Sequence, residues 1–185
     1  MGSQRIYNYS ESDIFVEVNK PMDINTPEFR EYFLDFSVAV TGFSRFHLHG
    51  TGQVSLYFDT IRNIIGAEIF GELLQTFHDL EEKAEFSDDK SFLATKLRSD
   101  IMASEKLGAI ARNIIKLWYV ATWYQLPQDW REVFGTKEND KTFVVSPQAY
   151  PEGLLWPTIG VNPPAAKAPG YGTWSEPPSV SLSKD

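Results

Sequence analysis

The chain has 185 residues, of which 42% are hydrophobic and 23% are charged, and its formal net charge is -8. This length suits one domain with a sizeable core, and no stretch approaches the roughly 20 consecutive apolar residues of a membrane span. The acidic balance argues against a nucleic-acid partner, because such binding depends on Lys and Arg displacing phosphate counterions. The absence of cysteine excludes disulfides, thiolate metal sites and a cysteine nucleophile.

The N-terminal region carries no recognisable targeting signal. Residues 1–25 mix polar, acidic and aromatic side chains, and we expect them to be irregular. The stretch from Met1 to Ile6 lacks the apolar core of a signal peptide, which favours a cytoplasmic protein. A Met-Gly-Ser start is also what remains when a leader has been replaced. The alternative is therefore a periplasmic protein that is exported together with its partner.

The first helix is predicted over residues 26–42. Thr26 supplies a capping hydroxyl, Pro27 suits the first helical position, and Gly42 closes the element. Aromatic and aliphatic side chains recur between these ends at helical spacing: Phe29, Tyr32, Phe33, Phe36 and Val40.

Two further helical patterns follow a loop predicted at residues 47–52. The first pattern begins at Thr51 or Gln53 and is interrupted at Gly66. The second leads into the acidic segment 81–89, which we interpret as a solvated helix end and loop. The apolar positions of the two patterns are Val54, Tyr57, Phe58, Ile61, Ile64 and Ile65, then Phe70, Leu73, Leu74, Phe77, Leu80 and Ala84.

The most informative element is a helix predicted over residues 89–126. Its second half has apolar residues on two opposite faces, separated by one narrow polar strip. The first face holds Ile110, Ile114, Leu117, Ala121 and Tyr124, the second holds Ile115, Tyr119, Trp123 and Leu126, and the strip holds Arg112, Asn113 and Lys116. Such a helix is buried on both sides, either as the central helix of a bundle or between the bundle and another protein.

Regular structure is expected to fade after this helix. Pro127 ends it, residues 142–145 form a short extended run, and Ser146 caps a brief helix through Trp156. From Pro157 onward the chain is rich in Pro, Gly, Ala and aromatic residues, a composition that does not hold regular structure.

These patterns predict a mainly α fold, a small helical bundle with an irregular, Pro- and aromatic-rich C-terminal arm. We expect a single domain over residues 1–185. Within it, residues 1–25 form an irregular N-terminal segment, 26–126 the helical core, and 127–185 a short helix and an extended arm.

No catalytic, cofactor-binding or metal-ligating site can be assembled from the sequence. His47 and His49 would chelate a metal from an extended strand, but no further ligands stand at conventional spacing. His78 lies on an amphipathic helix and is interpreted as a boundary residue. Residues 50–52 lack the preceding strand and the Lys of a phosphate loop, and the carboxylates form surface runs. A binding or interaction protein is therefore favoured over an enzyme.

Aromatic side chains make up 14% of the chain, and all five Trp residues lie at or after position 118. Aromatic residues dominate interface energetics, so this surplus points to a partner. A Trp-rich core explains the same composition. Both interpretations stay open at the level of the sequence.

The order of motifs in the last third resembles a known family. The motifs are Trp118-Tyr119 in an apolar helix, Val144-Val145, Tyr150-Pro151-Glu152-Gly153-Leu154-Leu155-Trp156, a Pro-rich stretch, and Pro169-Gly170-Tyr171-Gly172-Thr173-Trp174 before Pro177. This order is similar to that of the small subunit of FAD-dependent sorbitol, fructose and glucose dehydrogenases. In that family a Trp-Tyr-x-Gly helix precedes a Tyr-x-Glu-Ala-Leu-x-Trp segment and a terminal Pro-Gly-Tyr-Trp-like motif. Upstream, Val40-Thr41-Gly42 is similar to the family's Leu-Thr-Gly at the end of its first helix. The resemblance spans roughly residues 28–178.

The resemblance implies a non-catalytic helical subunit that binds, stabilises and matures a large glucose–methanol–choline type flavoprotein. In many members the small subunit also carries its partner through the export machinery. FAD and the substrate site would lie in the large subunit, and this chain would hold no cofactor. A Pro-rich arm loses little conformational freedom on binding, so its aromatic residues are suited to filling partner pockets. The predicted partner-contact residues are Trp118, Tyr119, Trp123, Tyr150, Leu154, Trp156, Tyr171 and Trp174.

The chain also departs from the family pattern. Members commonly carry a twin-arginine leader, which is not seen here, and this puts the export role in doubt. Many have a cysteine in the Pro-rich stretch, and its absence excludes a covalent tether to the partner. Ala121 and Gly153 stand where the family usually has Gly and Ala. These departures indicate a divergent member that serves a different substrate.

Two other classes of function stay open. One is a stand-alone helical small-ligand-binding protein or enzyme that uses its aromatic residues as a pocket. The other is an unrelated interaction domain or scaffold. A yellow complex with a large partner would favour the subunit, whereas a colourless, active monomer would favour the stand-alone protein.

Overall fold

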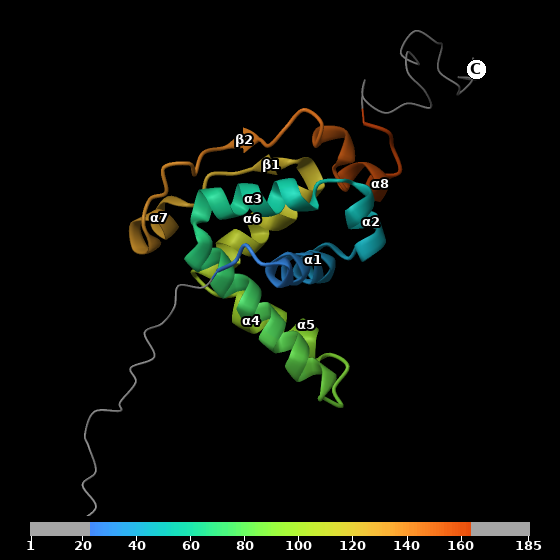
Figure 1. Cartoon of the computed structure of the whole chain (residues 1–185), viewed down its shortest axis with the longest axis vertical. Coiled ribbons are helices and arrows are strands. Elements are labelled where there is room, and N and C mark those ends of the chain that lie inside the picture. The colour runs from blue at the N-terminus through green and yellow to red at the C-terminus, as the bar shows by residue number, and fades with distance from the viewer. Residues whose placement is uncertain (1–22, 164–185) are drawn as a thin grey trace, which may run out of the picture.

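The computed structural model describes residues 23–163, and the segments 1–22 and 164–185 lie outside this description. Figure 1 shows a mainly helical molecule, with eight α-helices and one pair of two-residue strands in the described part. The predicted mainly α fold is confirmed. None of the described helices combines the length and apolarity that crossing a membrane requires.

The first helix forms where the sequence predicts it, as α1 (Pro27–Thr41). Pro27 occupies the first helical position, where a missing N–H costs nothing, and Gly42 ends the helix in the left-handed conformation with φ of 77°. Thr26 precedes the helix in an extended conformation, but its side chain makes no capping hydrogen bond. Phe33 and Phe36 are completely buried, so α1 contributes its aromatic stripe to the core.

The loop predicted at residues 47–52 is wrong, because most of it belongs to the short helix α2 (Arg45–Gly50). Ser44 caps this helix, and its hydroxyl accepts a hydrogen bond from the backbone N–H of His47 at 3.4 Å. Leu48 is the single buried side chain of α2. A helix of little more than one turn cannot display an apolar repeat, so its sequence carries no periodic signal.

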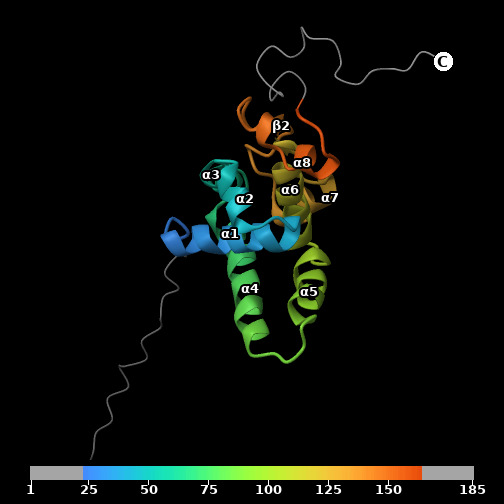
Figure 2. The same cartoon turned by 90° about the vertical axis from the view of Figure 1, so that its right-hand side faces the viewer.

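The next two helices match the predicted apolar patterns, as α3 (Val54–Ile65) and α4 (Ala67–Glu85). Gly66, with φ of 87°, makes the break between them. Beyond α4 the chain turns back into α5 (Phe92–Lys96) and the π-helical turn η1 (Leu97–Met102). Figure 2 shows α4 and α5 side by side, projecting from the body of the molecule. The exposed acidic segment lies at the tip of this hairpin, as a solvated helix end should.

The long helix predicted over residues 89–126 is wrong at both ends. Its central portion is α6, which covers only Leu107–Val120. Residues 103–106 are non-helical and separate α6 from η1. At the other end Ala121 adopts the left-handed conformation with φ of 52°, and the helix ends six residues earlier than predicted from periodicity.

Two buried polar side chains explain why the chain leaves the helix after α6. The carboxylate of Asp140 accepts hydrogen bonds from Trp123 Nε1 at 2.8 Å and from the backbone N–H of Leu126 at 3.0 Å. Asn113 is buried, not part of an exposed polar strip, and its amide bonds both the N–H and the C=O of Tyr124. Buried polar groups must be hydrogen-bonded, and these bonds require an extended backbone after α6.

The extended stretch carries β1 (Thr122–Trp123), which pairs antiparallel with β2 (Phe143–Val144). The extended run predicted at residues 142–145 is thereby confirmed, although its pairing partner was predicted to be helical. Between the strands lies α7 (Gln128–Phe134), which the sequence analysis does not predict. Trp130 fastens α7 to the bundle, since its ring is buried and its Nε1 donates to the Lys106 carbonyl at 2.8 Å.

The region predicted as one brief helix through Trp156 is instead two short turns. These are the 3₁₀ turn η2 (Tyr150–Glu152) and the helix α8 (Leu155–Ile159). The prediction that regular structure is absent from Pro157 onward is wrong for three residues, because a proline in the first turn of a helix removes no intrahelical hydrogen bond. Gly160 then ends α8 with φ of 69°.

The core lies between α1, α3, α4 and α6, with Trp118 of α6 at its centre. The Trp118 ring stacks on Phe33 at a centroid distance of 6.2 Å and meets the edge of Tyr57 at 4.9 Å. Its Nε1 donates to Ser37 Oγ at 2.9 Å, which satisfies the one polar atom of the ring. The sequence leaves two positions open for the helix that is apolar on opposite faces, the centre of the bundle or a boundary with another protein. In the structure this helix, α6, lies at the centre of the bundle.

Candidate partner-binding surface

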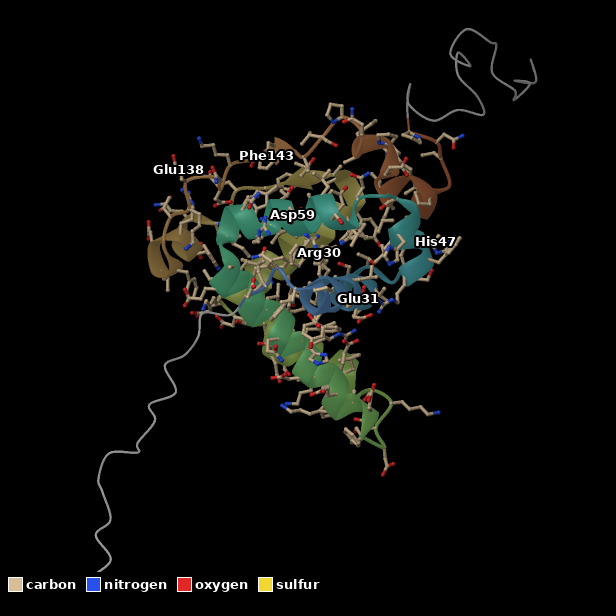
Figure 3. The ribbon with its side chains drawn as sticks, in the orientation of Figure 1. Arg30, Glu31, His47, Asp59, Glu138 and Phe143 are labelled. Atoms are coloured by element: carbon tan, nitrogen blue, oxygen red, sulfur yellow. The ribbon has the colours of Figure 1, made fainter. Side chains whose placement is uncertain are left out.

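Large apolar side chains that remain exposed gather near the C-terminal end of the described chain. Of ten exposed large hydrophobic residues in the part that the structure describes, five lie within residues 143–161: Phe143, Val144, Tyr150, Ile159 and Val161. Figure 3 labels Phe143, which is a residue of β2. We call the exposed surface of residues 143–161 the C-terminal face.

A groove separates the C-terminal face from α2. The helices α2 and α8 lie at the same end of the molecule in Figure 1, and the groove between them has a volume of about 370 Å³. Phe43 and Phe46 line it from one side, and Pro151, Trp156 and Pro163 from the other. Aromatic rings and prolines make up half of the fourteen lining residues, and Thr51, Glu152 and Asn162 add polar groups.

The C-terminal face is attached to the end of α6 by backbone hydrogen bonds. The N–H of Leu154 donates to the carbonyl of Trp118 at 3.0 Å, and the N–H of Val145 donates to the carbonyl of Ala121 at 2.9 Å. The last carbonyls of a helix have no intrahelical donor, so the C-terminal segment satisfies groups that would otherwise need water. The face is consequently held in a defined position relative to the core.

The α2 wall of the groove is held by charges on α1. The guanidinium of Arg45 forms ion pairs with Asp35 and Glu31, two carboxylates one turn apart on α1. Figure 3 shows His47 on α2 and Glu31 on α1 at this end of the molecule. A short helix with one buried side chain gains its orientation from such contacts.

Four of the predicted partner-contact residues belong to the chain's own interior. Trp118, Trp123 and Leu154 are exposed by no more than 2%. Tyr119 is half-buried, and its hydroxyl donates to the carbonyl of Thr41 at 3.0 Å. In this structure these side chains lie beneath the surface and support the groove and the C-terminal face, so they offer little area to a partner.

Two other predicted contact residues lie at the surface. Tyr150 is 37% exposed, and its ring meets the half-buried ring of Trp156 at a centroid distance of 5.3 Å. Trp156 Nε1 donates to the Tyr150 carbonyl at 2.9 Å, so the two side chains form one unit at the groove. Tyr171 and Trp174 lie outside the described residues.

Sequence reasoning misses the contribution of α2. Phe46 is 83% exposed, and Phe43 lies beside it in the groove wall. Ser44, which caps α2, is the one sequence feature that indicates a helix start here. The His and Gly residues that follow it are typical of a loop. The groove joins residues about one hundred positions apart, which no local pattern predicts.

One buried titratable group lies close to the groove. Burial raises the pKa of the Tyr57 hydroxyl above its ordinary value, and the charge of Glu152 adds to this effect. The hydroxyl is buried and makes no hydrogen bond within residues 23–163. A phenol in this state keeps its proton at neutral pH, so Tyr57 acts as a neutral core residue and not as an acid or base.

Two of the three histidines, His47 and His78, have structural partners. His47 Nδ1 lies 2.8 Å from Ser44 Oγ, and the ring of His78 stacks on Tyr32 with centroids 3.9 Å apart. Residues 23–163 contain no group of three or more His, Asp or Glu side chains arranged to hold a metal ion.

No protein-family profile, no curated protein and no solved structure matches this chain. The motifs of the sequence and the geometry of the C-terminal face and groove therefore carry the functional proposal.

Proposed function

We propose that the chain is the non-catalytic small subunit of a complex with a large FAD-dependent oxidoreductase of the glucose–methanol–choline type, acting on a sugar or an alcohol. The chain binds the large subunit through its C-terminal face and arm, stabilises it and helps it to mature. FAD and the substrate site belong to the large subunit, and the chain itself holds no cofactor. A cytoplasmic location is part of this proposal.

The observation that carries the proposal is the concentration of exposed apolar side chains on the C-terminal face. Exposed apolar and aromatic side chains are candidates for partner contacts, because the buried centres of interfaces are enriched in aromatic residues. Because the face is fixed to α6 by backbone hydrogen bonds, it is preorganised, which reduces the entropic cost of binding.

The backbone fits the family's usual residue at Ala121 but not at Gly153, where the family usually has Ala and a Cβ would lie 2.7 Å from the carbonyl oxygen of Tyr119. Ala121 is the one non-glycine residue with positive φ among residues 23–163. The resembled family usually has glycine at the matching position, after Trp-Tyr-x. Glycine is the residue that a left-handed conformation favours, so the backbone here has the conformation that suits the family's residue.

The first experiment is purification of the tagged full chain from its native host. We expect a yellow complex in which a large flavoprotein elutes with the chain in a fixed ratio. The refolded chain alone should be colourless and inactive. Stoichiometric FAD in the isolated chain, or a chain that elutes alone and active, would overturn the proposal.

The second experiment locates the interface. Deletion of residues 164–185 should preserve the helical circular dichroism and the unfolding temperature but abolish assembly, because α8 and the buried Pro163 remain in place. Trp174→Ala should weaken assembly at least about tenfold, since an anchor in a partner pocket typically contributes about 2 kcal/mol or more. Phe86 is 89% exposed on the distant hairpin, so Phe86→Ala is the matched control and should leave assembly unchanged. Unchanged affinity after the deletion would move the interface to the helices.

The groove favours one alternative, a stand-alone protein that binds a small ligand in an aromatic pocket. Its volume of about 370 Å³ lies at the lower end of the roughly 300–1,000 Å³ of ligand sites. This alternative would be favoured if the isolated chain bound a small apolar compound and Phe46→Ala weakened that binding. It also requires that no flavoprotein partner purifies with the chain.

A further inference from the structure

The groove between α2 and α8 combines aromatic rings from both of its walls with one carboxylate. Phe43 and Phe46 contribute rings from the α2 side, and Trp156 contributes its indole from α8. Among residues 23–163, Glu152 is the one acidic side chain that lines the groove, and no Lys or Arg does so. The faces of aromatic rings carry negative electrostatic potential, as a carboxylate does, so this lining favours a positively charged ligand.

The ring of Phe46 is accessible to a ligand. It is 83% exposed, and it meets the ring of His47 at an interplanar angle of 79° with centroids 6.1 Å apart. With this exposure and a perpendicular contact, at least one face of the phenyl ring stays open. A cation binds over such a face, within about 6 Å of the ring centroid. Phe46 therefore offers the geometry that a cation requires.

The other two rings of the groove are held in place by neighbouring groups. Trp156 Nε1 donates to the Tyr150 carbonyl at 2.9 Å, and the Tyr150 ring meets the indole at a centroid distance of 5.3 Å. These contacts fix the plane of the indole, the ring system that attracts cations most strongly. Phe43 packs against the rings of His47 and Tyr119, with centroids 5.9 and 6.2 Å away. The aromatic lining is therefore preorganised and loses little side-chain entropy on binding.

Glu152 supplies the charge that complements a cation. It ends the turn η2, is partly buried, and lies near enough to the Tyr57 hydroxyl for its charge to raise the pKa of that phenol. The attraction between a partly buried carboxylate and a cation in the same groove is screened less than it would be on an open surface. A neutral ligand of the same shape gains nothing from this charge.

We propose that the groove binds a small organic cation whose charge is a quaternary ammonium group, held against Phe46 and Trp156 and paired with Glu152. The groove volume of about 370 Å³ suits a compound of this size. A quaternary ammonium group fits better than a lysine side chain, because the compact lysine ammonium is strongly hydrated and costly to move onto aromatic rings. This inference goes beyond the proposed function, since it concerns a small ligand of this chain and not its assembly with a flavoprotein.

The test is calorimetric titration of the purified full chain with two soluble compounds of equal shape. The probe is (3-hydroxypropyl)trimethylammonium, and its control is 4,4-dimethylpentan-1-ol, in which carbon replaces the ammonium nitrogen. We expect the cation to bind at least about tenfold more tightly than the neutral alcohol, because only the cation interacts with the ring faces and the carboxylate through its charge. Equal affinities would overturn the cation assignment and leave a merely apolar groove. No detectable binding of the cation at millimolar concentration would overturn the site itself.

Two variants connect this binding to the groove. Phe46→Leu keeps an apolar side chain but removes the aromatic face, and Glu152→Gln keeps the shape of the side chain but removes its charge. Each should weaken binding of the cation about three- to tenfold and leave binding of the neutral alcohol unchanged. Phe46 is exposed, so Phe46→Leu should retain the helical circular dichroism of the wild type. Phe86→Leu, at the distant hairpin, is the matched control and should change neither affinity. Unchanged affinity for the cation in either groove variant would overturn the proposal.

A third ligand distinguishes a free compound from a side chain of a partner. The peptide acetyl-Gly-Lys-Gly-amide presents the primary ammonium of a protein lysine and should bind at least about tenfold more weakly than the quaternary probe. Tighter binding of the peptide would overturn the small-ligand assignment and give the groove to a lysine of a partner. All of these measurements use the chain alone, so their outcome is independent of whether a flavoprotein co-purifies.

Discussion

The core around Trp118 and the C-terminal face use aromatic residues in opposite ways. In the core each indole finds a polar partner inside the protein, as Trp118 does with Ser37 and Trp123 does with Asp140. On the face, Phe143 and its neighbours remain in solvent. Aromatic richness in the last third of this chain therefore has two causes. Core formation accounts for the early Trp residues, and the interpretation as a partner surface is confined to the exposed ones.

The largest effect that tests this comparison is expected at Trp118. Trp118→Ala removes a completely enclosed indole and leaves a cavity among aromatic rings, so it should lower the free energy of unfolding by about 3–5 kcal/mol. Tyr150→Ala removes a partly exposed ring and should cost less than about 1 kcal/mol. Urea denaturation followed by circular dichroism measures both. Equal losses would mean that the face is part of the core.

A smaller effect is expected where the two regions meet. A Cβ on Gly153 would lie 2.7 Å from the backbone carbonyl oxygen of Tyr119, so Gly153→Ala requires the C-terminal segment to move away from α6. We expect a loss of about 1–3 kcal/mol, as for other overpacked sites. The control is Gly50→Ala, where a Cβ meets nothing within 4 Å. The measurement is the thermal unfolding midpoint of the two variants. An unchanged midpoint for Gly153→Ala would show that the contact between the C-terminal segment and α6 adjusts without loss of stability.

The left-handed residue at the end of α6 gives a test of intermediate size. Ala121→Gly relieves about 1–2 kcal/mol of backbone strain but loses a buried methyl and gains unfolded-state entropy, which together cost about as much. Its net effect should lie within about 0.5 kcal/mol of zero. Ala111→Gly, in the middle of α6, has no strain to relieve and should cost about 1.5–2 kcal/mol. A similar loss for both variants would contradict the strain at Ala121.

A small, pH-dependent effect concerns the charged side of α4. Burial raises the pKa of Glu81 to about 7, the nearby Asp35 adds to the shift, and Arg45 opposes it. A carboxyl whose pKa is higher in the folded than in the unfolded state binds its proton more tightly when folded. Its contribution to stability is therefore present below the unfolded value and is lost as the pH rises toward 7.

Glu81→Gln should remove this pH dependence and make the chain more stable than wild type at pH 8, by less than about 1 kcal/mol because the site is partly solvated. Unfolding temperatures of the two proteins between pH 5 and pH 8 should converge at the acidic end. Parallel curves over that range would mean that Glu81 titrates normally in the folded protein.

Local patterns in the sequence determine much of this fold. The helix from Pro27, the break at Gly66 and the apolar stripes of α3 and α4 follow from residue chemistry within one or two turns, and all of them lie where the sequence predicts. Periodicity also indicates that α6 is buried on both sides, because an element that is apolar on nearly all sides has to be surrounded. It does not distinguish the centre of the bundle from a boundary with another protein.

Only the tertiary structure decided where α6 ends and which residues form the groove. Periodicity continues through Trp123 and Leu126, but Asp140, fourteen residues beyond Leu126, supplies hydrogen bonds that favour an extended backbone there. The groove likewise joins Phe46 to Trp156 across more than one hundred residues. Such long-range pairings set the local conformation, because leaving a buried polar group without a hydrogen bond costs more free energy than the helix propensity of a few residues provides.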